Sequence, residues 1–134
     1  MDPRFLDHFQ APRGAGELTR PDARVQVSNP VCGDELTLDR GLAEGRIAAL
    51  AWRVRGCSGA IAAASALHER ARGRTPAEAA AIDEAALEAL LGPLPALKRH
   101  GLTLALDGLR AALARLTTNT PGRPDGPGTR GASA

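Results

Sequence analysis

Aromatic residues are almost missing from this chain, which has two phenylalanines, one tryptophan and no tyrosine among 134 residues. Hydrophobic residues still make up 43% of the sequence, so a core has to be built mainly from Ala, Leu, Val and Ile. We expect Trp52, Phe5 and Phe9 to supply its few large side chains. The length suits one domain with a single modest core.

A large excess of charge of either sign is also missing. The chain carries 17 Lys and Arg against 15 Asp and Glu, a formal net charge of +2. Its arginines are scattered, with almost no aromatic residues between them on which bases could stack. Both features argue against a nucleic-acid partner.

Long hydrophobic runs are absent as well. The first residues, MDPRFLDHFQ, lack the apolar region of a signal peptide, and no later run has the length needed to span a membrane. We therefore expect a cytoplasmic protein with no membrane partner. The two cysteines, Cys32 and Cys57, are then more readily free thiols or metal ligands than a disulfide.

The order of hydrophobic patterns predicts an α+β fold, in which helices pack against a small three-stranded antiparallel sheet. Strand patterns come first and are joined by links short enough for antiparallel pairing, and helical patterns follow. The last helix is long and amphipathic, with Leu102, Leu106, Leu109 and Leu113 along one face. The predicted strands are residues 23–30, 34–39 and 47–56, and the predicted helices are residues 2–10, 57–73, 76–92 (with Asp83 as a potential break) and a last one from about His100 onward. Thr75 and Glu78 have the spacing of a capping box at the start of the third of these helices.

The end of the sequence differs in composition from the rest. From Thr117 onward it reads TTNTPGRPDGPGTRGASA and contains no apolar residue larger than Ala. Such a segment cannot bury enough apolar surface to order itself. We therefore predict one domain over residues 1–116 and a disordered tail over residues 117–134.

The motif NPVCGDEL holds the first candidate site residues. Asn29-Pro30 favours a turn, and Gly33 frees the backbone directly after the thiol. Cys32 and Asp34 thus share one tight bend, where a thiolate and a carboxylate could bind one metal ion. On these residues alone, a buried structural cysteine at the start of a strand explains Cys32 equally well.

A second candidate, Cys57, lies in RGCSGAIAAAS, where the third predicted strand meets a long helix. The free N–H groups of a first helical turn, the positive end of the helix dipole and nearby Arg55 all favour a thiolate. Gly56 and Gly59 permit close approach of backbone or of a partner. The alternative is that Cys57 is an inert small hydrophobic residue.

The stretch LPALKRHGL contains the third candidate, His100, which we expect in the first turn of the last helix. Taken alone, His100 is an ordinary exposed residue at a helix end. Cys32, Asp34, Cys57 and His100 together would suit zinc or an iron–sulfur cluster. Their wide separation in the sequence does not by itself show that they share a site.

The other two histidines fit this site less well. His68 follows Cys57 by eleven residues, which at about 1.5 Å per residue separates them by roughly 16 Å along one helix. They cannot share a metal ion. His8 is expected to be a packing or capping residue.

The motifs, in order, resemble those of the iron–sulfur cluster assembly scaffolds of the IscU/NifU N-terminal type. The matching segments, which span roughly residues 5–115, are DHFQAPRGAGEL, NPVCGDEL, RGCSGAIAAASAL, GRTPAEA and LPALKRHG. The resemblance implies a three-stranded antiparallel sheet covered by helices. It also implies transient assembly of a 2Fe–2S cluster from iron and desulfurase-derived sulfide, and transfer of that cluster to apo-protein clients.

The resemblance also assigns roles to single residues. Cys32, Asp34, Cys57 and His100 fall on the cluster- or zinc-binding positions of the family. The segment LPALK falls on the one that a DnaK-like chaperone recognises, and the residues that match there are Leu94, Pro95 and Lys98. The implied partners are therefore a cysteine desulfurase, apo-protein clients and a DnaK-like chaperone.

One position departs from the family pattern. The family has a third cysteine directly after the histidine, where it serves as a cluster ligand and receives persulfide sulfur, and this chain has Gly101 there. Two cysteines, a histidine and an aspartate still provide four ligands for zinc, but fewer thiolates should hold a 2Fe–2S cluster more weakly. Restoring the thiol with Gly101→Cys is expected to raise the cluster yield.

Two interpretations of the altered site follow. The first is a scaffold with a degenerate ligand set that binds iron, a labile 2Fe–2S cluster or zinc. The alternative is a metal-independent paralogue that binds and regulates the desulfurase or the chaperone. A thiol enzyme with Cys57 as nucleophile and His100 as base has no substrate-pocket signature in the sequence, so we expect no enzymatic turnover.

Overall fold

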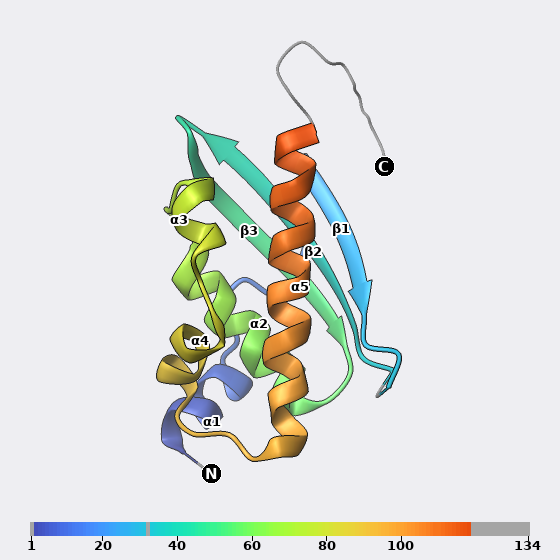
Figure 1. The fold of residues 1–134 in the computed structure, drawn as a ribbon, viewed down its shortest axis with the longest axis vertical. Coiled ribbons are helices and arrows are strands. Elements are labelled where there is room, and N and C mark those ends of the chain that lie inside the picture. The colour runs from blue at the N-terminus through green and yellow to red at the C-terminus, as the bar shows by residue number, and fades with distance from the viewer. Residues whose placement is uncertain (1, 32, 119–134) are drawn as a thin grey trace.

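The computed structural model describes residues 2–31 and 33–118. Strands come first and most helices follow, as Figure 1 shows, so the predicted α+β fold is confirmed. The elements are α1 (Pro3–Gln10), β1 (Ala23–Ser28), β2 (Glu35–Ala43), β3 (Arg46–Arg55), α2 (Ser58–Ala71), α3 (Pro76–Ala80), α4 (Glu84–Leu91) and α5 (Ala96–Thr118).

The three strands form one antiparallel sheet in the order β1-β2-β3. In its register Leu38 of β2 lies between Val25 of β1 and Trp52 of β3. β2 and β3 are joined by Glu44 and Gly45, both with positive φ, of 55° and 75°. Two such residues make the tight hairpin turn whose twist matches that of the strands.

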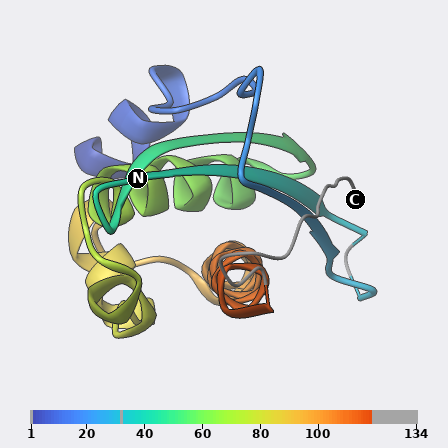
Figure 2. The ribbon, with the colours of Figure 1, turned by 90° about the horizontal axis from the view of Figure 1, so that it is seen from above.

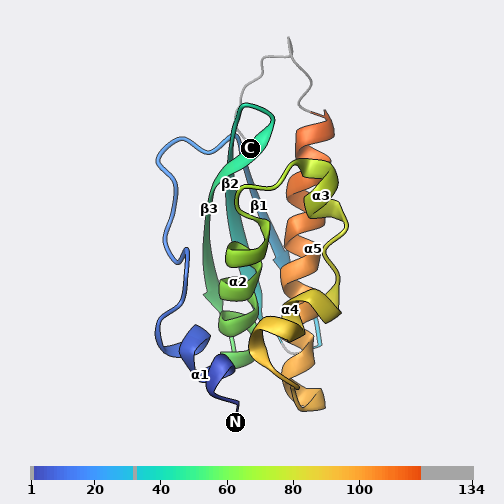
Figure 3. The same ribbon diagram turned by 90° about the vertical axis from the view of Figure 1, so that its left-hand side faces the viewer.

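The helices α2 and α5 cover one face of the sheet, and the segment 11–22 crosses the opposite face (Figure 2). Alanines fill most of the buried face of α2, so this helix packs closely against both β3 and α5. The stripe of α5 is buried at Leu102, Leu106 and Leu109, and Leu113 is partly buried. Figure 3 shows α4 beside α2 and α5, which closes the core on its remaining side.

Two details of the sequence prediction were wrong. Phe9 is 39% exposed and lies outside the core, because His8 takes the buried position on α1 beside Phe5. The last helix starts at Ala96, so His100 is its fifth residue and lies beyond the first turn. α5 continues to Thr118, and the predicted division into a domain over residues 1–116 and a tail stays a prediction. The rest of the predicted tail lies outside the described residues.

Other local predictions are confirmed. A break near Asp83 separates α3 from α4. The capping box at the start of α3 is present, since Thr75 Oγ1 accepts from the Glu78 amide at 3.1 Å and Glu78 Oε1 accepts from the Thr75 amide at 3.0 Å. Across residues 2–31 and 33–118, no helix is both long enough and apolar enough to cross a bilayer.

A buried polar cluster fastens α1 to α2. The Nδ1 atom of His8 lies 2.7 Å from Ser65 Oγ, which also accepts a hydrogen bond of 2.9 Å from the Arg13 amide. The other ring nitrogen, Nε2, lies 3.3 Å from a carboxylate oxygen of Glu69. This geometry fits a neutral ring that donates from Nε2 and accepts from the Ser65 hydroxyl, so His8 is a packing residue as predicted.

An ion network holds the segment 11–22 on the outer face of the sheet. The fully buried Asp39 of β2 accepts hydrogen bonds of 2.7 Å from Arg24 Nε, 3.3 Å from Arg53 Nη1 and 3.0 Å from the Leu18 amide. Burial alone would raise the pKa of Asp39, but the hydrogen bonds from Arg24 and Arg53 outweigh it and hold the pKa below its usual value.

Candidate functional site

Three junctions of the chain meet at the lower end of the molecule in Figure 1. They are the loop between β1 and β2, the link from β3 to α2, and the first turns of α5. The motifs of the candidate site residues lie in these junctions. The sheet and the two long helices therefore bring together segments that are far apart in the sequence.

The loop between β1 and β2 is a tight bend. The Asn29 amide donates to the Asp34 carbonyl at 2.9 Å, and the Gly33 amide donates to the Asn29 carbonyl at 2.7 Å. Gly33 has a φ of 79°, in the left-handed region that favours glycine. The bend ends with the Asp34 side chain turned inward, since Asp34 is only 6% exposed. Cys32 lies outside the described residues.

Cys57 occupies the N-cap position of α2. Its carbonyl accepts from the amides of Ala60 and Ile61 at 3.1 and 3.2 Å, which starts the helix. Its side chain makes no capping bond. The exposed thiol instead donates from Sγ to Asp34 Oδ2 at 3.2 Å. A soft sulfur ligand and a carboxylate oxygen thus lie side by side.

Gly56 makes this pair possible. A Cβ at position 56 would lie 2.5 Å from Asp34 Cγ and 2.9 Å from Asp34 Cβ, closer than side-chain carbons approach one another. The glycine before the cysteine therefore leaves the space that the aspartate fills. The small size of Gly56 is visible in the sequence, but nothing there indicates that Asp34 is the residue that needs it.

The start of α5 is tied to the start of α2 by Lys98. Its Nζ donates to Ser58 Oγ at 2.8 Å and lies 5.6 Å from the ring centre of Phe5 in α1. This contact places His100, which is exposed, on the α5 turn near the α2 start. Among residues 2–31 and 33–118 no three His, Cys, Asp or Glu side chains lie close enough together to hold a metal ion. The four-ligand set with Cys32 therefore stays a prediction.

Gly101 packs directly on the backbone of α2. A Cβ at this position would lie 2.5 Å from the carbonyl carbon of Gly59 and 2.7 Å from the Ala60 amide nitrogen. Conversely, a Cβ at Gly59 would lie 2.9 Å from the Lys98 carbonyl oxygen. Each glycine thus accommodates the other helix. Position 101 is filled by this helix contact, so a thiol cannot simply be added there, and the expected benefit of Gly101→Cys no longer follows.

The predicted chaperone-binding residues have different environments. Leu94 is buried, Pro95 is exposed, and Lys98 is half-buried and held by Ser58. Two large apolar residues outside this predicted set are more exposed than Leu94 and Lys98. They are Val31 in the loop before Asp34, at 85%, and Leu97 in the first turn of α5, at 82%.

Comparison with known proteins agrees with this architecture. The chain matches the family model of the NifU-like N terminal domain over residues 2–121. A crystal structure of a nitrogen-fixing NifU-like protein (N-terminal) from Brucella abortus superposes with a TM-score of 0.75 at 19% identity, covering 89% of this chain and 95% of that one. This likeness shows the shared fold.

Curated relatives are similar at the level of sequence. The chain is 40% identical over 110 residues to iron-sulfur cluster assembly scaffold protein IscU 1 of Archaeoglobus fulgidus, across 82% of this chain and 72% of that protein. It is 34% identical over 119 residues to IscU of Haemophilus influenzae, across 83% and 90%. It is also 44% identical over 113 residues to the bifunctional protein NifU/MnmA of Rubrobacter xylanophilus, of which it spans 23%. The chain therefore belongs to the NifU-like N-terminal domain family of IscU/NifU-type scaffolds.

Proposed function

We propose that this chain is an iron–sulfur cluster assembly scaffold that works with an altered ligand set. Its assembly site would consist of Cys32, Asp34, Cys57 and His100, and its cargo would be iron or a labile 2Fe–2S cluster, with zinc as an alternative occupant. The observation that carries the proposal is the 3.2 Å contact between Cys57 Sγ and Asp34 Oδ2. Relatives that are named as assembly scaffolds support it.

The chemistry of the donor set fits this cargo. A thiolate suits iron of a cluster and zinc alike, and a carboxylate oxygen completes a mixed set without a third thiolate. Two thiolates, one carboxylate and a neutral imidazole would carry a total charge of about −3, enough to balance a divalent ion or the core of a small cluster. The smaller number of thiolates weakens retention, which suits a protein that releases its cargo. No step in this role requires turnover by the chain itself.

The proposed partners are a cysteine desulfurase, which would supply sulfide, apo-protein clients and a DnaK-like chaperone. Leu94, Pro95 and Lys98 remain the proposed chaperone contacts. Because Leu94 is buried and Lys98 is held by Ser58, a chaperone would bind this segment only after the start of α5 detaches from α2. The exposed Val31 and Leu97 provide apolar surface beside the site for a protein that covers it.

Anaerobic reconstitution tests the proposal. Incubation with ferrous iron, cysteine, a desulfurase and excess dithiothreitol, which reduces persulfide sulfur to sulfide, should yield bound iron and acid-labile sulfide with the visible absorbance of a cluster. Cys57→Ser, Cys32→Ser and Asp34→Asn should each lower the yield strongly. Asp107→Asn, an exposed aspartate of α5, is the matched control for Asp34→Asn and should leave the yield unchanged. Wild-type protein that binds neither a cluster nor zinc would contradict the proposal.

The metal-independent interpretation keeps one observation in its favour. Gly59 and Gly101 pack against each other at the position that corresponds to the third cysteine of the family pattern. This packing leaves no room for a ligand side chain at position 101. On this interpretation the chain binds and regulates the desulfurase or the chaperone. A pull-down with immobilised desulfurase, with and without a chelator, separates the two: retention that chelation leaves unchanged, in protein that takes up no metal, favours the paralogue.

A further inference from the structure

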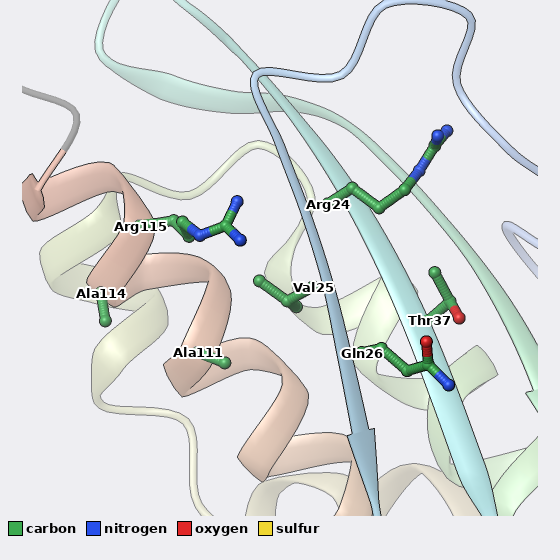
Figure 4. Close-up of a pocket in the computed structure, with 7 residues that line it drawn as sticks. All are labelled: Arg24, Val25, Gln26, Thr37, Ala111, Ala114 and Arg115. Carbon is green, nitrogen blue, oxygen red and sulfur yellow. The ribbon is translucent and has the colours of Figure 1, made fainter. Parts of the chain in front are cut away.

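A groove lies at the other end of the molecule from the candidate site. It has a volume of about 650 Å³ and runs over the outer edge of β1 toward α5 (Figure 4). In this view Arg115 extends from α5 toward β1, and Val25 points back toward the helix. Arg115 follows His100 by fifteen residues, about 22 Å along the helix axis. The lining residues are Arg24, Val25, Gln26, Thr37, Ala111, Ala114 and Arg115.

The two edges of the sheet differ in whether another segment of the chain hydrogen-bonds to them. The edge at β3 is covered, because the Trp52 amide donates to the Gly14 carbonyl at 3.0 Å and the Gly16 amide donates to the Trp52 carbonyl at 2.9 Å. The edge at β1 pairs with no further strand of the described chain, residues 2–31 and 33–118. An uncovered edge offers unpaired backbone groups to an extended segment of another protein.

The pairing of β1 with β2 shows which backbone groups face the groove. The Asn29 amide donates to the Asp34 carbonyl, and the same register pairs Val25 with Leu38. Backbone groups alternate in direction along an antiparallel strand, so the N–H and C=O groups of the odd-numbered residues of β1 point toward β2. The N–H and C=O groups of Arg24 and Gln26 therefore point outward, along the groove.

The charges of the residues that line the groove favour an acidic occupant. Two arginines, Arg24 and Arg115, line it, and no acidic residue does, although Arg24 also binds Asp39 at 2.7 Å and lies 3.7 Å from Glu17. A second copy of this chain would bring its own arginines against these, so like charges would face one another across a paired edge. An acidic segment would meet them with opposite charge, which favours both recognition and rapid association.

A buried arginine lies next to the groove. Arg40 of β2 is only 1% exposed, and its Nη2 approaches the carbonyl of Ala112, the neighbour of the lining residue Ala111, at 3.4 Å. Its Nε and Nη1 have no partner in the described part of the chain. Burial lowers the pKa of this guanidinium to about 10. A buried charge with unsatisfied donors destabilises a fold, and an anion in the adjacent groove would lower that cost through space.

We propose that this groove binds an acidic, extended segment of a partner protein. The segment adds to β1 as a fourth strand, through the outward backbone groups of Arg24 and Gln26, and sets a carboxylate against Arg115, close to the buried Arg40. This partner would bind about 22 Å along α5 from His100, so it could stay bound while the cluster site is occupied. The inference does not depend on the proposed function.

Fluorescence anisotropy with defined peptides tests the inference. The probe is a fluorescein-labelled octapeptide of alternating Glu and Val, titrated with the full chain at low and at high salt. We expect saturable binding that weakens with salt, and loss of binding when alternate backbone nitrogens of the peptide are methylated. Equal binding of a Lys-Val octapeptide, or equal binding of the methylated peptide, would overturn the proposal.

Charge-reversal variants on one helix locate the site. Arg115→Glu should lower the affinity for the Glu-Val peptide by about tenfold or more. Arg110→Glu makes the same change on an exposed residue of α5 outside the lining, and should lower it less than about twofold. Equal losses in the two variants would mean general charge attraction and would overturn the proposal. So would sedimentation that shows a dimer in which Arg115→Glu strengthens self-association.

Arg40→Met separates a binding role from a structural one. Methionine is apolar and flexible enough to fill the space of the arginine stem, so the thermal midpoint of the free chain should stay the same or rise. Affinity for the Glu-Val peptide should nonetheless fall by about fivefold or more. A lower midpoint with unchanged affinity would assign Arg40 to packing alone and remove it from the proposed site.

Discussion

Gly101 of α5 faces Gly59 of α2 so closely that neither residue can carry a side chain in this arrangement. A Cβ at Gly101 would meet the Gly59 carbonyl carbon at 2.5 Å, and a Cβ at Gly59 would meet the Lys98 carbonyl oxygen at 2.9 Å. Both contacts are to backbone, which cannot rotate away as a side chain would. The size of the residue that position 101 can carry is therefore coupled to packing at position 59.

The first prediction concerns stability at this contact. Replacing a helical glycine by alanine normally gains about 1 kcal/mol in helix propensity. Here the added Cβ must separate α5 from α2, and such overpacking destabilises by about 1–3 kcal/mol or more. We expect the clash to dominate, so Gly101→Ala and Gly101→Cys should both lower the free energy of unfolding, measured in urea.

The alanine variant is the matched control for the thiol. If both variants lose stability to a similar extent, the loss arises from Cβ and not from sulfur, and Gly101→Cys should bind no more cluster than the parent chain. A Gly101→Cys protein with unchanged stability and higher cluster yield would show that position 101 faces the site after all.

The second prediction concerns Gly56. A Cβ there would displace the Asp34 side chain, since it would lie 2.5 Å from Asp34 Cγ, and so separate it from Cys57. Gly56→Ala should therefore weaken zinc or iron binding by about tenfold or more, as loss of a ligand's positioning commonly does. Gly41→Ala is the matched control, because its Cβ would meet atoms only at ordinary distances of 3.7 Å and beyond. Equal metal affinity in both variants, measured by competition with a chromophoric chelator, would contradict it.

Much of this fold follows from local sequence patterns. The alternation of apolar residues predicted the strands, and the capping-box spacing of Thr75 and Glu78 predicted the start of α3. Short-range patterns failed where a tertiary contact decided the outcome. On α1, spacing made Phe9 the partner of Phe5 in the core, but the hydrogen bond between His8 and Ser65 rotates the helix so that His8 is buried instead.

The contact between Asp34 and Cys57 could be anticipated from the sequence, but the packing around it could not. The motifs around Asp34 and Cys57 identified the pair that the structure brings into contact. The contact between Gly59 and Gly101 joins helices about forty residues apart, and one sequence gives no signal that pairs them. Arg40 had a signal, since it continues the inward alternation of Leu36 and Leu38, but its charge argued against burial.

The third prediction concerns acid stability. Burial, reinforced by the charge of Arg13, lowers the pKa of His8 below 6.5, against the opposing effects of Glu69 and Asp7. Burial and Arg72 lower the pKa of His68 in the same way. Below about pH 6.5 the unfolded chain binds protons that the folded chain excludes, so stability is fully present above that pH and is lost as the pH falls toward the folded-state pKa values. Each histidine can add a slope of at most about 1.4 kcal/mol per pH unit.

The measurement is the free energy of unfolding in urea at a series of pH values from neutral to mildly acidic. His8→Gln should make the unfolding free energy decline less steeply as the pH falls. His68 should account for part of the pH dependence that remains in this variant. A His8→Gln protein with an unaltered pH profile would show that His8 titrates equally in the folded and unfolded states.

The fourth prediction concerns Asp39, whose carboxylate joins β1, β3 and the segment 11–22. Asp39→Asn removes a buried charge but keeps its shape, and leaves Arg24 and Arg53 without their anion. Both arginines are partly exposed, so water can replace some of the loss, and we expect a decrease of about 1–3 kcal/mol in unfolding free energy. Glu17→Gln removes the exposed carboxylate 3.7 Å from Arg24 and should change it by less than about 0.5 kcal/mol. Unfolding in urea at neutral pH compares the two variants. Equal changes in unfolding free energy would mean that the burial of Asp39 contributes nothing to stability.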